Sequence, residues 1–582
     1  MGMKAMNRKA LWLVVPVVAA LAGCGVGPTG RSATGTTAAL DAELARLAAV
    51  LEGTVSQYAY IEAGGAQVVR GYGLVVGLGT NGSSGCPTEV RNRLVEQMAG
   101  LGVGDARTGT KALSPNRLID DPDTAVVIVS AIIAPGTPRG APLDVSVSAL
   151  PRSQTLSLEG GVLFRTELRA FNVDGGAVNE SRLLAEAEGP VFVNPFAPNR
   201  DPTMTARLRQ GRVIGGGATL EGRKIQLVLR QPDYRIAGVL QEAINSAFPD
   251  YPKVANARTP ALVEITIPRR FRGDWGRFLQ QVMHLYVRRG GGIEDRKARE
   301  LVEAIAEPDA PYDTISLVWE TMGRQVLPLI REVYASANPE ASYYAARAGA
   351  RLGDPVAVEV LAACARDRSA HRLEAIAELG AAGTLLAEDT LRELLNDPDA
   401  LVRIATYEAL QAGRLGGGIE RVDVDGKFAL HIVPSTADRM IYATRTEQPR
   451  IVLFGGGLLV RRPIFFTTPD DLVTINANSA ADLLQVYRRV GARKRLSETV
   501  TITADLKSLI LALGRTPEPD VHGHCESLGL TYSQVVSVLY RLCETEAGKQ
   551  VPAEFVLQSP DRTDTITPGS TPPGRQAVSS RL

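Results

Sequence analysis

The sequence predicts an α+β fold of several small strand–helix–strand and β-rich units, with an all-α solenoid segment inserted between them. Three observations support this prediction. Short apolar runs rich in valine and isoleucine, bounded by glycine or proline, recur towards both ends of the chain. An amphipathic helix over 234–248 joins two such runs, and the middle of the chain is instead rich in alanine, leucine and arginine. For 582 residues we expect about four structural units.

The composition narrows the class of protein. The apolar share of 45% and the charged share of 22% are those of an ordinary globular chain. The net charge is +1, aromatic residues make up 5%, and no basic stripe alternates with them, so the pattern does not favour a nucleic-acid partner. The chain has five histidines, too few to form the clusters typical of many catalytic sites.

Residues 1–23 have the pattern of a lipoprotein signal peptide. A basic start precedes an apolar segment over 10–21, which is too short to cross a bilayer core that needs about 20 residues. The signal ends in Leu-Ala-Gly-Cys, which resembles a bacterial lipobox and makes Cys24 the expected lipidation site and membrane anchor. The alternative is an ordinary cleaved signal peptide. Residues 24–37 are rich in glycine, serine and threonine and are predicted to be a flexible tether.

A glycine-punctuated apolar stretch over 71–85, GYGLVVGLGTNGSSG, predicts a strand buried on both faces, followed by an Asn-Gly turn. A strand with so few side chains must be held by neighbouring elements or by a neighbouring subunit. A dinucleotide-binding loop is disfavoured because the third glycine comes one residue late and no helix start follows. A phosphate-binding P-loop is disfavoured because its Gly-Lys-Ser/Thr is absent.

The other elements of the region 38–270 follow from periodicity. The expected helices have apolar residues three or four apart, and the strand over 143–149 alternates apolar and polar residues. In chain order we expect a helix over 38–52, extended structure over 57–79, a helix over 88–101, strands over 125–133, 143–149 and 160–167, loops and short strands over 171–200, and a strand–helix–strand unit over 224–267.

Several of these segments together resemble one known family. The phrases are GYGLVVGLGTNG (71–82), AVVIVSAIIAPGTPRGAPLDVSVSAL (125–150), LSLEGGVLFRTEL (156–168) and LVLRQPDYRIAGVLQEAIN (227–245). Their order and spacing over about 57–268 are similar to those of the bacterial flagellar P-ring protein family. The resemblance implies a structural subunit of the basal body, not an enzyme, with no cofactor and no catalytic or metal site.

The resemblance also implies a mode of action in motility. Such a subunit assembles with copies of itself as a closed ring around the flagellar rod in the periplasm and acts as a bushing. The implied partners are the rod, the outer-membrane ring protein and peptidoglycan, and a lipid anchor places the chain at the inner face of the outer membrane. A ring subunit needs two different surfaces, which exposed sheet edges could supply. Candidate ring-packing residues are Gly71, Gly73, Gly77 and Gly79.

The segment 271–415 is predicted to be an inserted helical solenoid similar to HEAT repeats. Near-repeats begin at Tyr344, Arg372 and Arg403, with aspartate- and proline-containing breaks between them. The P-ring family has no such segment in this place, so we interpret it as an insertion. A surface for another protein and a purely bracing role are equally compatible with the pattern.

The region 416–558 returns to P-ring-like α+β character. Strands are expected within 421–476, and the closing helix over 504–513, helix over 529–542 and strand over 552–558 resemble the end of the P-ring family. Residues 559–582 are rich in serine, threonine, proline and arginine, which predicts a disordered tail.

Reactive side chains are few. Export would allow Cys525 and Cys543, which flank one predicted helix, to form a disulfide that stabilises the fold by about 3 kcal/mol. The sequence His522-Gly523-His524-Cys525 is a weak metal candidate because zinc normally needs four ligands, so a solvent-facing loop is favoured. The acidic run 120–123 is interpreted as a turn.

Two other functions are compatible with the sequence. The first is a lipid-anchored, P-ring-like envelope scaffold that is not tied to motility. The second is an envelope hydrolase that uses the glycine stretch and the pair His522 and His524.

Overall fold

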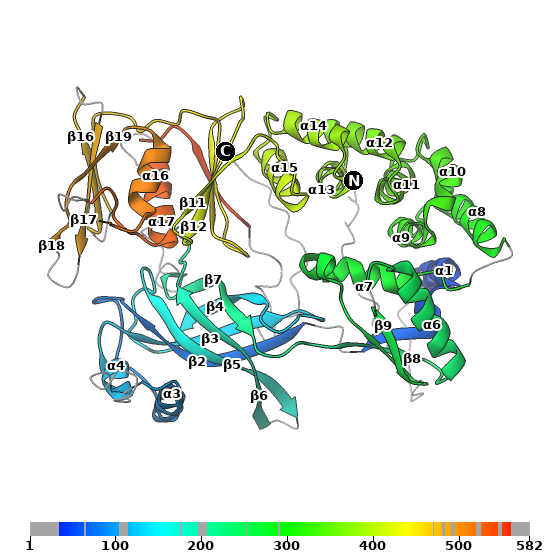
Figure 1. Cartoon of the computed structure of the whole chain (residues 1–582), viewed down its shortest axis with the longest axis horizontal. Coiled ribbons are helices and arrows are strands. Elements are labelled where there is room, and N and C mark those ends of the chain that lie inside the picture. The colour runs from blue at the N-terminus through cyan, green and yellow to red at the C-terminus, as the bar shows by residue number, and fades with distance from the viewer. Residues whose placement is uncertain are drawn as a thin grey trace. The chain divides into compact units, whose positions relative to one another are not determined.

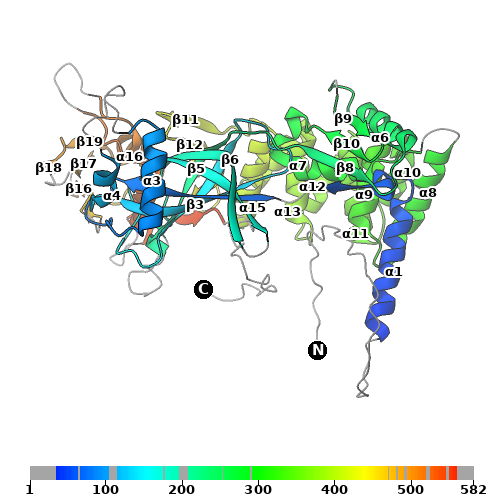
Figure 2. The same ribbon diagram turned by 90° about the horizontal axis from the view of Figure 1, so that it is seen from below.

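The computed structural model describes residues 34–62, 66–103, 114–174, 177–195, 207–251, 253–288, 292–468, 471–479, 483–490, 495–518, 525–544 and 550–559 (Figure 1). The chain divides into two compact units, 1–49 and 50–582. Helix α1 (Thr34–Leu51) is one continuous helix, as Figure 2 shows, and confirms the helix predicted there. Within the described residues, we find no helix with the length and apolarity needed to cross a membrane.

Six strands of the second unit close into an antiparallel barrel (Figure 1). Around the barrel they are β2 (Gln67–Val76), β3 (Ala125–Ile133), β4 (Pro142–Ala149), β7 (Gln210–Thr219), β6 (Ala177–Pro190) and β5 (Val162–Asp174), which pairs again with β2. Closure leaves no open edge among these strands. The sequence predicted β-rich units here but not their closure.

Two strands of the barrel differ from the prediction. Residues 171–200 were expected to be loops and short strands, but β5 continues to Asp174 and the long strand β6 follows. Strand β7 was not predicted. The sequence of β6 mixes acidic and apolar residues, and β7 contains Gly-Gly-Gly, so neither has the local pattern of a strand. Pairing with distant strands overrides these weak local preferences.

The barrel has an apolar interior and a covered outer side. Valines from β2, β3, β4 and β7 fill the interior, among them Val75, which is fully buried. The neighbouring Leu74 points the other way and packs beneath α3 (Thr88–Gly100) and α4 (Pro115–Asp120). The prediction that the glycine-punctuated strand is buried on both faces is therefore confirmed.

A second sheet contains the predicted strand–helix–strand unit. Its strands, in spatial order, are β1 (Ala59–Glu62), β8 (Ile225–Leu229), β10 (Leu262–Ile265) and β9 (Ala255–Thr259). Helix α6 (Tyr234–Ala247) begins at Asp233, whose carboxylate accepts hydrogen bonds from two backbone N–H groups. This helix shares an apolar core with the sheet, α2 (Val55–Tyr58) and α7 (Trp275–His284).

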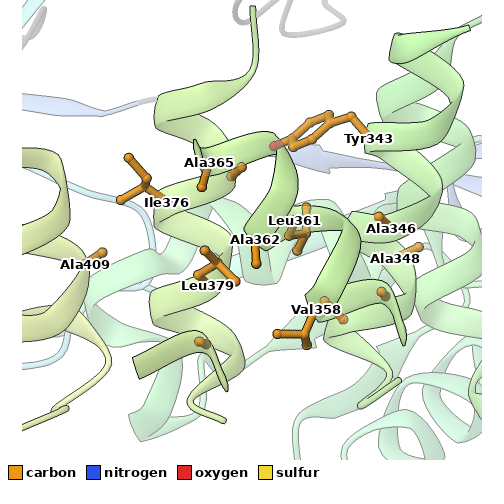
Figure 3. Packing of buried hydrophobic residues seen from close by; sticks show 14 of the residues in the cluster. Tyr343, Ala346, Ala348, Val358, Leu361, Ala362, Ala365, Ile376, Leu379 and Ala409 are labelled. Carbon is orange, nitrogen blue, oxygen red and sulfur yellow. The ribbon is translucent and has the colours of Figure 1, made fainter. Parts of the chain in front are cut away.

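The middle of the chain is helical, as predicted. After the 3₁₀ turn at Arg269–Asp274 and α7, the helices are α8 (Ile293–Ala306), α9 (Tyr312–Met322), α10 (Leu327–Ile330), α11 (Pro339–Arg351), α12 (Pro355–Arg366), α13 (Arg372–Ala382), α14 (Leu385–Leu394) and α15 (Ala400–Ala412). Small apolar side chains fill the space between α11, α12, α13 and α15, among them Ala346, Ala362 and Ala365 (Figure 3). Their relation to HEAT repeats stays a prediction.

Each near-repeat of the helical segment contains a glycine at a close contact. A Cβ placed on Gly349 would lie 1.9 Å from the Tyr334 hydroxyl oxygen, and one on Gly380 would lie 2.6 Å from the Ala409 carbonyl oxygen. A Cβ on Gly413 would lie 2.3 Å from the Gly380 carbonyl oxygen. Gly380 and Gly413 thus let α13 and the end of α15 approach more closely than a side chain would allow, and Gly349 leaves room for the Tyr334 hydroxyl.

Two sheets and two helices form the C-terminal region. The first sheet has the order β11 (Glu420–Val424), β12 (Phe428–Val433), β14 (Arg450–Phe454), β13 (Met440–Ala443), β20 (Glu554–Leu557). The second contains β15 (Ile464–Thr467), β16 (Val473–Ala477), β17 (Leu483–Val490), β18 (Arg495–Leu496) and β19 (Val500–Thr503). Helices α16 (Leu506–Gly514) and α17 (Tyr532–Glu544) share one core with both sheets, and with β20 they confirm the predicted closing elements.

Candidate assembly surfaces

Two of the candidate glycines are used inside the barrel. The register between β2 and β5 shifts between Arg70 and Val75, and Gly71 and Gly73 lie in that interval. A Cβ on Gly71 would lie 2.0 Å from the Glu167 carbonyl oxygen, and one on Gly73 would lie 2.4 Å from the Thr166 hydroxyl oxygen. These glycines therefore let β5 cross close to β2 within one subunit. The structure gives them this role instead of a place on an open edge.

The other two glycines lie in the turn after β2. Gly77 and Gly79 have positive φ angles of 82° and 62°, which favour glycine, and a Cβ on either would meet no atom within 4 Å. The Leu78 N–H donates to the Asp123 carbonyl oxygen at 2.9 Å, and the Gly79 N–H donates to the Asp123 carboxylate. Of the four candidate ring-packing positions, these two remain open to a neighbouring copy, and that role stays a prediction.

The acidic run 120–123, between α4 and β3, lies against this glycine turn. Asp121 accepts a hydrogen bond from the Asp123 N–H at 2.9 Å, and Asp120 pairs with Arg91 of α3 at 2.6 Å. Together with the bonds that Asp123 accepts from the glycine turn, these contacts hold the loop against α3 and the end of β2. The acidic run is thus a structural turn, as the sequence suggested.

A polar cleft of about 450 Å³ lies between α3 and the barrel strands β2 and β5. Burial lowers the pKa of Arg93, and the positive charge of Arg169 lowers it further. Arg169 in turn pairs with Glu167 at 2.8 Å. The cleft was not predicted, because its residues come from three elements that are far apart in the sequence. Its lining residues are Tyr72, Arg93, Glu96, Gln97, Glu167 and Arg169.

A buried ionic network links α7 to the helical segment. Arg277 of α7 donates to both carboxylate oxygens of Glu320 on α9, at 2.5 and 2.6 Å, and the Glu320 side chain is only 3% exposed. Arg347 of α11 lies 4.0 Å from Glu320 and pairs with Asp313 at 2.6 Å. The network fixes α7, α9 and α11 to one another, and no local sequence pattern predicts it.

Exposed apolar side chains of the second unit include ones in the helical segment and in the C-terminal region, beside others such as Tyr60 and Val239. In the helical segment they stand at or next to the first residue of a helix, with Leu385 of α14 82% exposed and Leu401 of α15 63% exposed. In the C-terminal region they include Phe465 of β15, which is 78% exposed, and Leu496 of β18. Single exposed apolar side chains are normal on a protein surface, and they indicate a surface that another protein covers where they form a contiguous patch.

The remaining predicted sites are partly outside the described residues. Cys24, His522 and His524 lie there. Cys525 and Cys543 are not disulfide-bonded in the structure, so the pairing stays a prediction. The backbone N–H of Cys525 donates a hydrogen bond to the Glu498 carboxylate at 2.9 Å. In the part of the chain that the structure describes, no three His, Cys, Asp or Glu side chains gather as metal ligands would.

Comparison with known proteins gives one family. Residues 55–294 match the family described as Flagellar P-ring protein. The flagellar P-ring protein of Geotalea uraniireducens is 31% identical over 227 residues, which cover 37% of this chain and 56% of the relative. That of Thermotoga petrophila is 29% identical over 226 residues, covering 37% and 61%, and that of Geobacter metallireducens is 29% identical over 228 residues, covering 38% and 57%.

The chain therefore spans between 56% and 61% of the length of these relatives. The matched residues contain the whole barrel, the sheet β1-β8-β10-β9, α6 and α7. The match continues past residue 270, where the sequence placed the start of the helical insertion. The resemblance seen in the sequence is confirmed: residues 55–294, from α2 to the start of α8, match the flagellar P-ring family.

Proposed function

We propose that this chain is a structural subunit of the flagellar basal-body P ring, which closes around the rod in the periplasm and acts as a bushing. The observation that carries the proposal is the match over 55–294, because it includes every strand of the closed barrel and the adjoining sheet. The proposed role needs no catalytic residue and no cofactor. It requires a stiff body and a repeated contact between copies.

The described structure is suited to a mechanical part. The six barrel strands pair with one another on both sides, and their interior is filled by buried valines. Interiors of this kind are close-packed and resist deformation. The Arg277–Glu320 pair then fixes α7, near the end of the matched region, to α9 of the middle segment.

The partners follow from the same proposal. They are further copies of this chain in the ring, the flagellar rod, the outer-membrane ring protein and peptidoglycan. The chain is anchored by a lipid on Cys24 to the inner face of the outer membrane. The HEAT-like helical segment supplies an additional protein-binding surface, for which the exposed leucines of α14 and α15 are the supporting observation.

A second candidate function is a lipid-anchored envelope scaffold, similar to the P ring but not tied to motility. Two observations favour it. The lipobox-like sequence ends at Cys24, and residues 295–582 lie outside the family match. The helical segment would then connect the ring to an envelope protein instead of the motor.

Deletion of the gene in the host separates the two functions. A P-ring subunit predicts cells that cannot swim and basal bodies that lack the ring in electron micrographs. A scaffold predicts normal basal bodies with an altered envelope. Labelling with palmitate tests the anchor, and the label should be absent from a Cys24→Ser variant.

A further inference from the structure

The sheets of the second unit end in strands that differ in how they are protected. Outside the barrel, the described end strands include β1, β9, β11, β20 and β15. Natural sheets usually protect such edges with charged residues or bulges, because an open edge pairs readily with another chain. Strand β11 contains three charged residues, β9 contains Arg258 and pairs irregularly with β10, and β20 begins with Glu554.

Strand β15 has no such protection. Its sequence, Ile464-Phe465-Phe466-Thr467, contains no charge. Ile464 and Phe466 are buried in the C-terminal core, whereas Phe465 is 78% exposed. Pairing with β16 fixes the register of the strand, with Phe465 opposite Asn476, and its other side has no partner among the described strands. An uncharged edge with an exposed aromatic side chain is suited to pairing with a further strand.

Strand β1 is the end strand that complements β15. It has the same length, and its side chains alternate in the same way, with Ala59 buried and Tyr60 and Glu62 exposed. Tyr60 is 45% exposed, and β1 ends in the acidic Glu62. Strand β15 is preceded by the exposed residues Arg461 and Arg462. The two edges thus match in aromatic character and have opposite charges at the ends that an antiparallel pairing brings together.

We propose that β15 of one copy pairs antiparallel with β1 of the next copy, with Phe465 opposite Tyr60. In this register Glu62 lies opposite Pro463, beside Arg462, and Ile61 lies opposite Ile464. The contact joins two different surfaces, so it is heterologous and repeats from copy to copy until a ring closes. This inference rests on the proposed ring function and assigns its contact to two strands, one of which lies outside the family match.

The pairing has a structural consequence for the ring. Strand β1 pairs with β8, and β15 pairs with β16. Their association makes one continuous sheet across each boundary between copies, from β9 through β10, β8 and β1 to β15, β16 and β17. Backbone hydrogen bonds would then supply the contact, and the paired aromatic side chains its register.

Cysteine cross-linking tests the register directly. The full chain would carry Tyr60→Cys and Phe465→Cys in a background in which Cys86, Cys364 and Cys525 are serine. Mild oxidation should give a ladder of linked copies, because directly opposite Cβ atoms lie within about 4.5–5.5 Å. The matched control combines Phe465→Cys with Val239→Cys on α6, where Val239 is 49% exposed, and should give no ladder. Dimers from Phe465→Cys alone would show that β15 pairs with itself and would overturn the inference.

A charge reversal provides a second test that does not depend on cysteine chemistry. Arg462→Glu should weaken self-association at least tenfold in sedimentation, and the double variant with Glu62→Arg should restore it. Rings that form with wild-type strength in Arg462→Glu and give no cross-linked ladder would overturn the pairing and leave the ring function intact. A wild-type chain that stays monomeric would overturn both.

Discussion

The barrel and the helical segment achieve rigidity in different ways. In the barrel, strands far apart in the sequence close on one another, and Gly71 and Gly73 stand where two backbones have no room for a side chain. In the helical segment, helices pack on neighbours that are close in the sequence, such as α11 on α12 and α12 on α13, and ion pairs such as Arg351–Glu378 at 2.5 Å link α11 to α13. Both regions thus contain glycines that leave no room for a side chain, but strand pairing closes the barrel, whereas ion pairs link the helices of the helical segment.

The largest expected effect is at Gly71. A Cβ there would lie 2.0 Å from a backbone carbonyl oxygen that the closed barrel holds in place. Gly71→Val should lower the free energy of unfolding by about 4 kcal/mol, because neither strand can move without opening the barrel. Denaturant unfolding followed by circular dichroism measures the change.

A glycine outside such a contact provides the control for this prediction. Gly238 lies inside α6, and a Cβ there would meet no atom within 4 Å. Gly238→Ala should raise the free energy of unfolding of its unit by about 1 kcal/mol through helix propensity. Equal stability losses in the two variants would contradict the role assigned to Gly71.

A medium effect is expected in the helical segment at Asp354. Its buried carboxylate accepts hydrogen bonds from Arg331 at 2.9 Å and from the Tyr334 hydroxyl at 2.9 Å, and it caps α12. Asp354→Ala should cost about 2 kcal/mol, because it removes a cap and leaves a buried hydroxyl without its acceptor. Asp399, which caps α15 at an exposed position, is the matched control, and Asp399→Ala should cost about 1 kcal/mol.

Asp354 also makes the stability of the helical segment depend on pH. The hydrogen bonds from Arg331 hold the pKa of Asp354 below its usual value. Its contribution is therefore fully present above the usual value of 3.8 and is lost as the pH falls through the lower pKa of the folded chain. The stability difference between wild type and Asp354→Ala should shrink as the pH falls from 6 to 3. A difference that stays constant over this range would show that the carboxylate charge is unimportant.

The smallest effects are expected for exposed ion pairs in either region. Arg392 pairs with Glu388 on α14 at 2.7 Å, and Arg182 pairs with Glu221 beside the barrel at 2.8 Å. Arg392→Ala and Arg182→Ala should each cost about 0.3 kcal/mol, because water screens exposed pairs. Thermal unfolding of the two variants tests this. A loss above 1 kcal/mol in either would show that the exposure of an ion pair does not predict its contribution to stability.

The sequence predicted those helices and strands that can be recognised from their own residues, without knowing which elements they pack against. Strand β3 is an apolar run interrupted by a single serine, α6 has an aspartate cap and apolar residues at helical spacing, and both were predicted with nearly correct bounds. Strand β7 was missed because its three glycines have no intrinsic strand preference. It becomes a strand only because β4 and β6 pair with it.

The candidate assembly surfaces could likewise be predicted only in part, because they depend on contacts between distant residues. The glycines at 71, 73, 77 and 79 were recognisable as special, but the sequence could not separate the pair used inside the barrel from the pair in the turn. The buried pair Arg277–Glu320 joins residues 43 positions apart, and its partners look like ordinary surface charges in the sequence. Phe465 could have been noticed as an aromatic residue in a strand, yet only the register with β16 shows that it faces solvent.

We propose that the chain works by joining copies of itself into a ring. The most direct measurement is the mass of the natively purified full-length protein by light scattering, with electron microscopy of the same sample. We expect a single large species that appears as closed rings. A chain that keeps the mass of one copy at every concentration would contradict it.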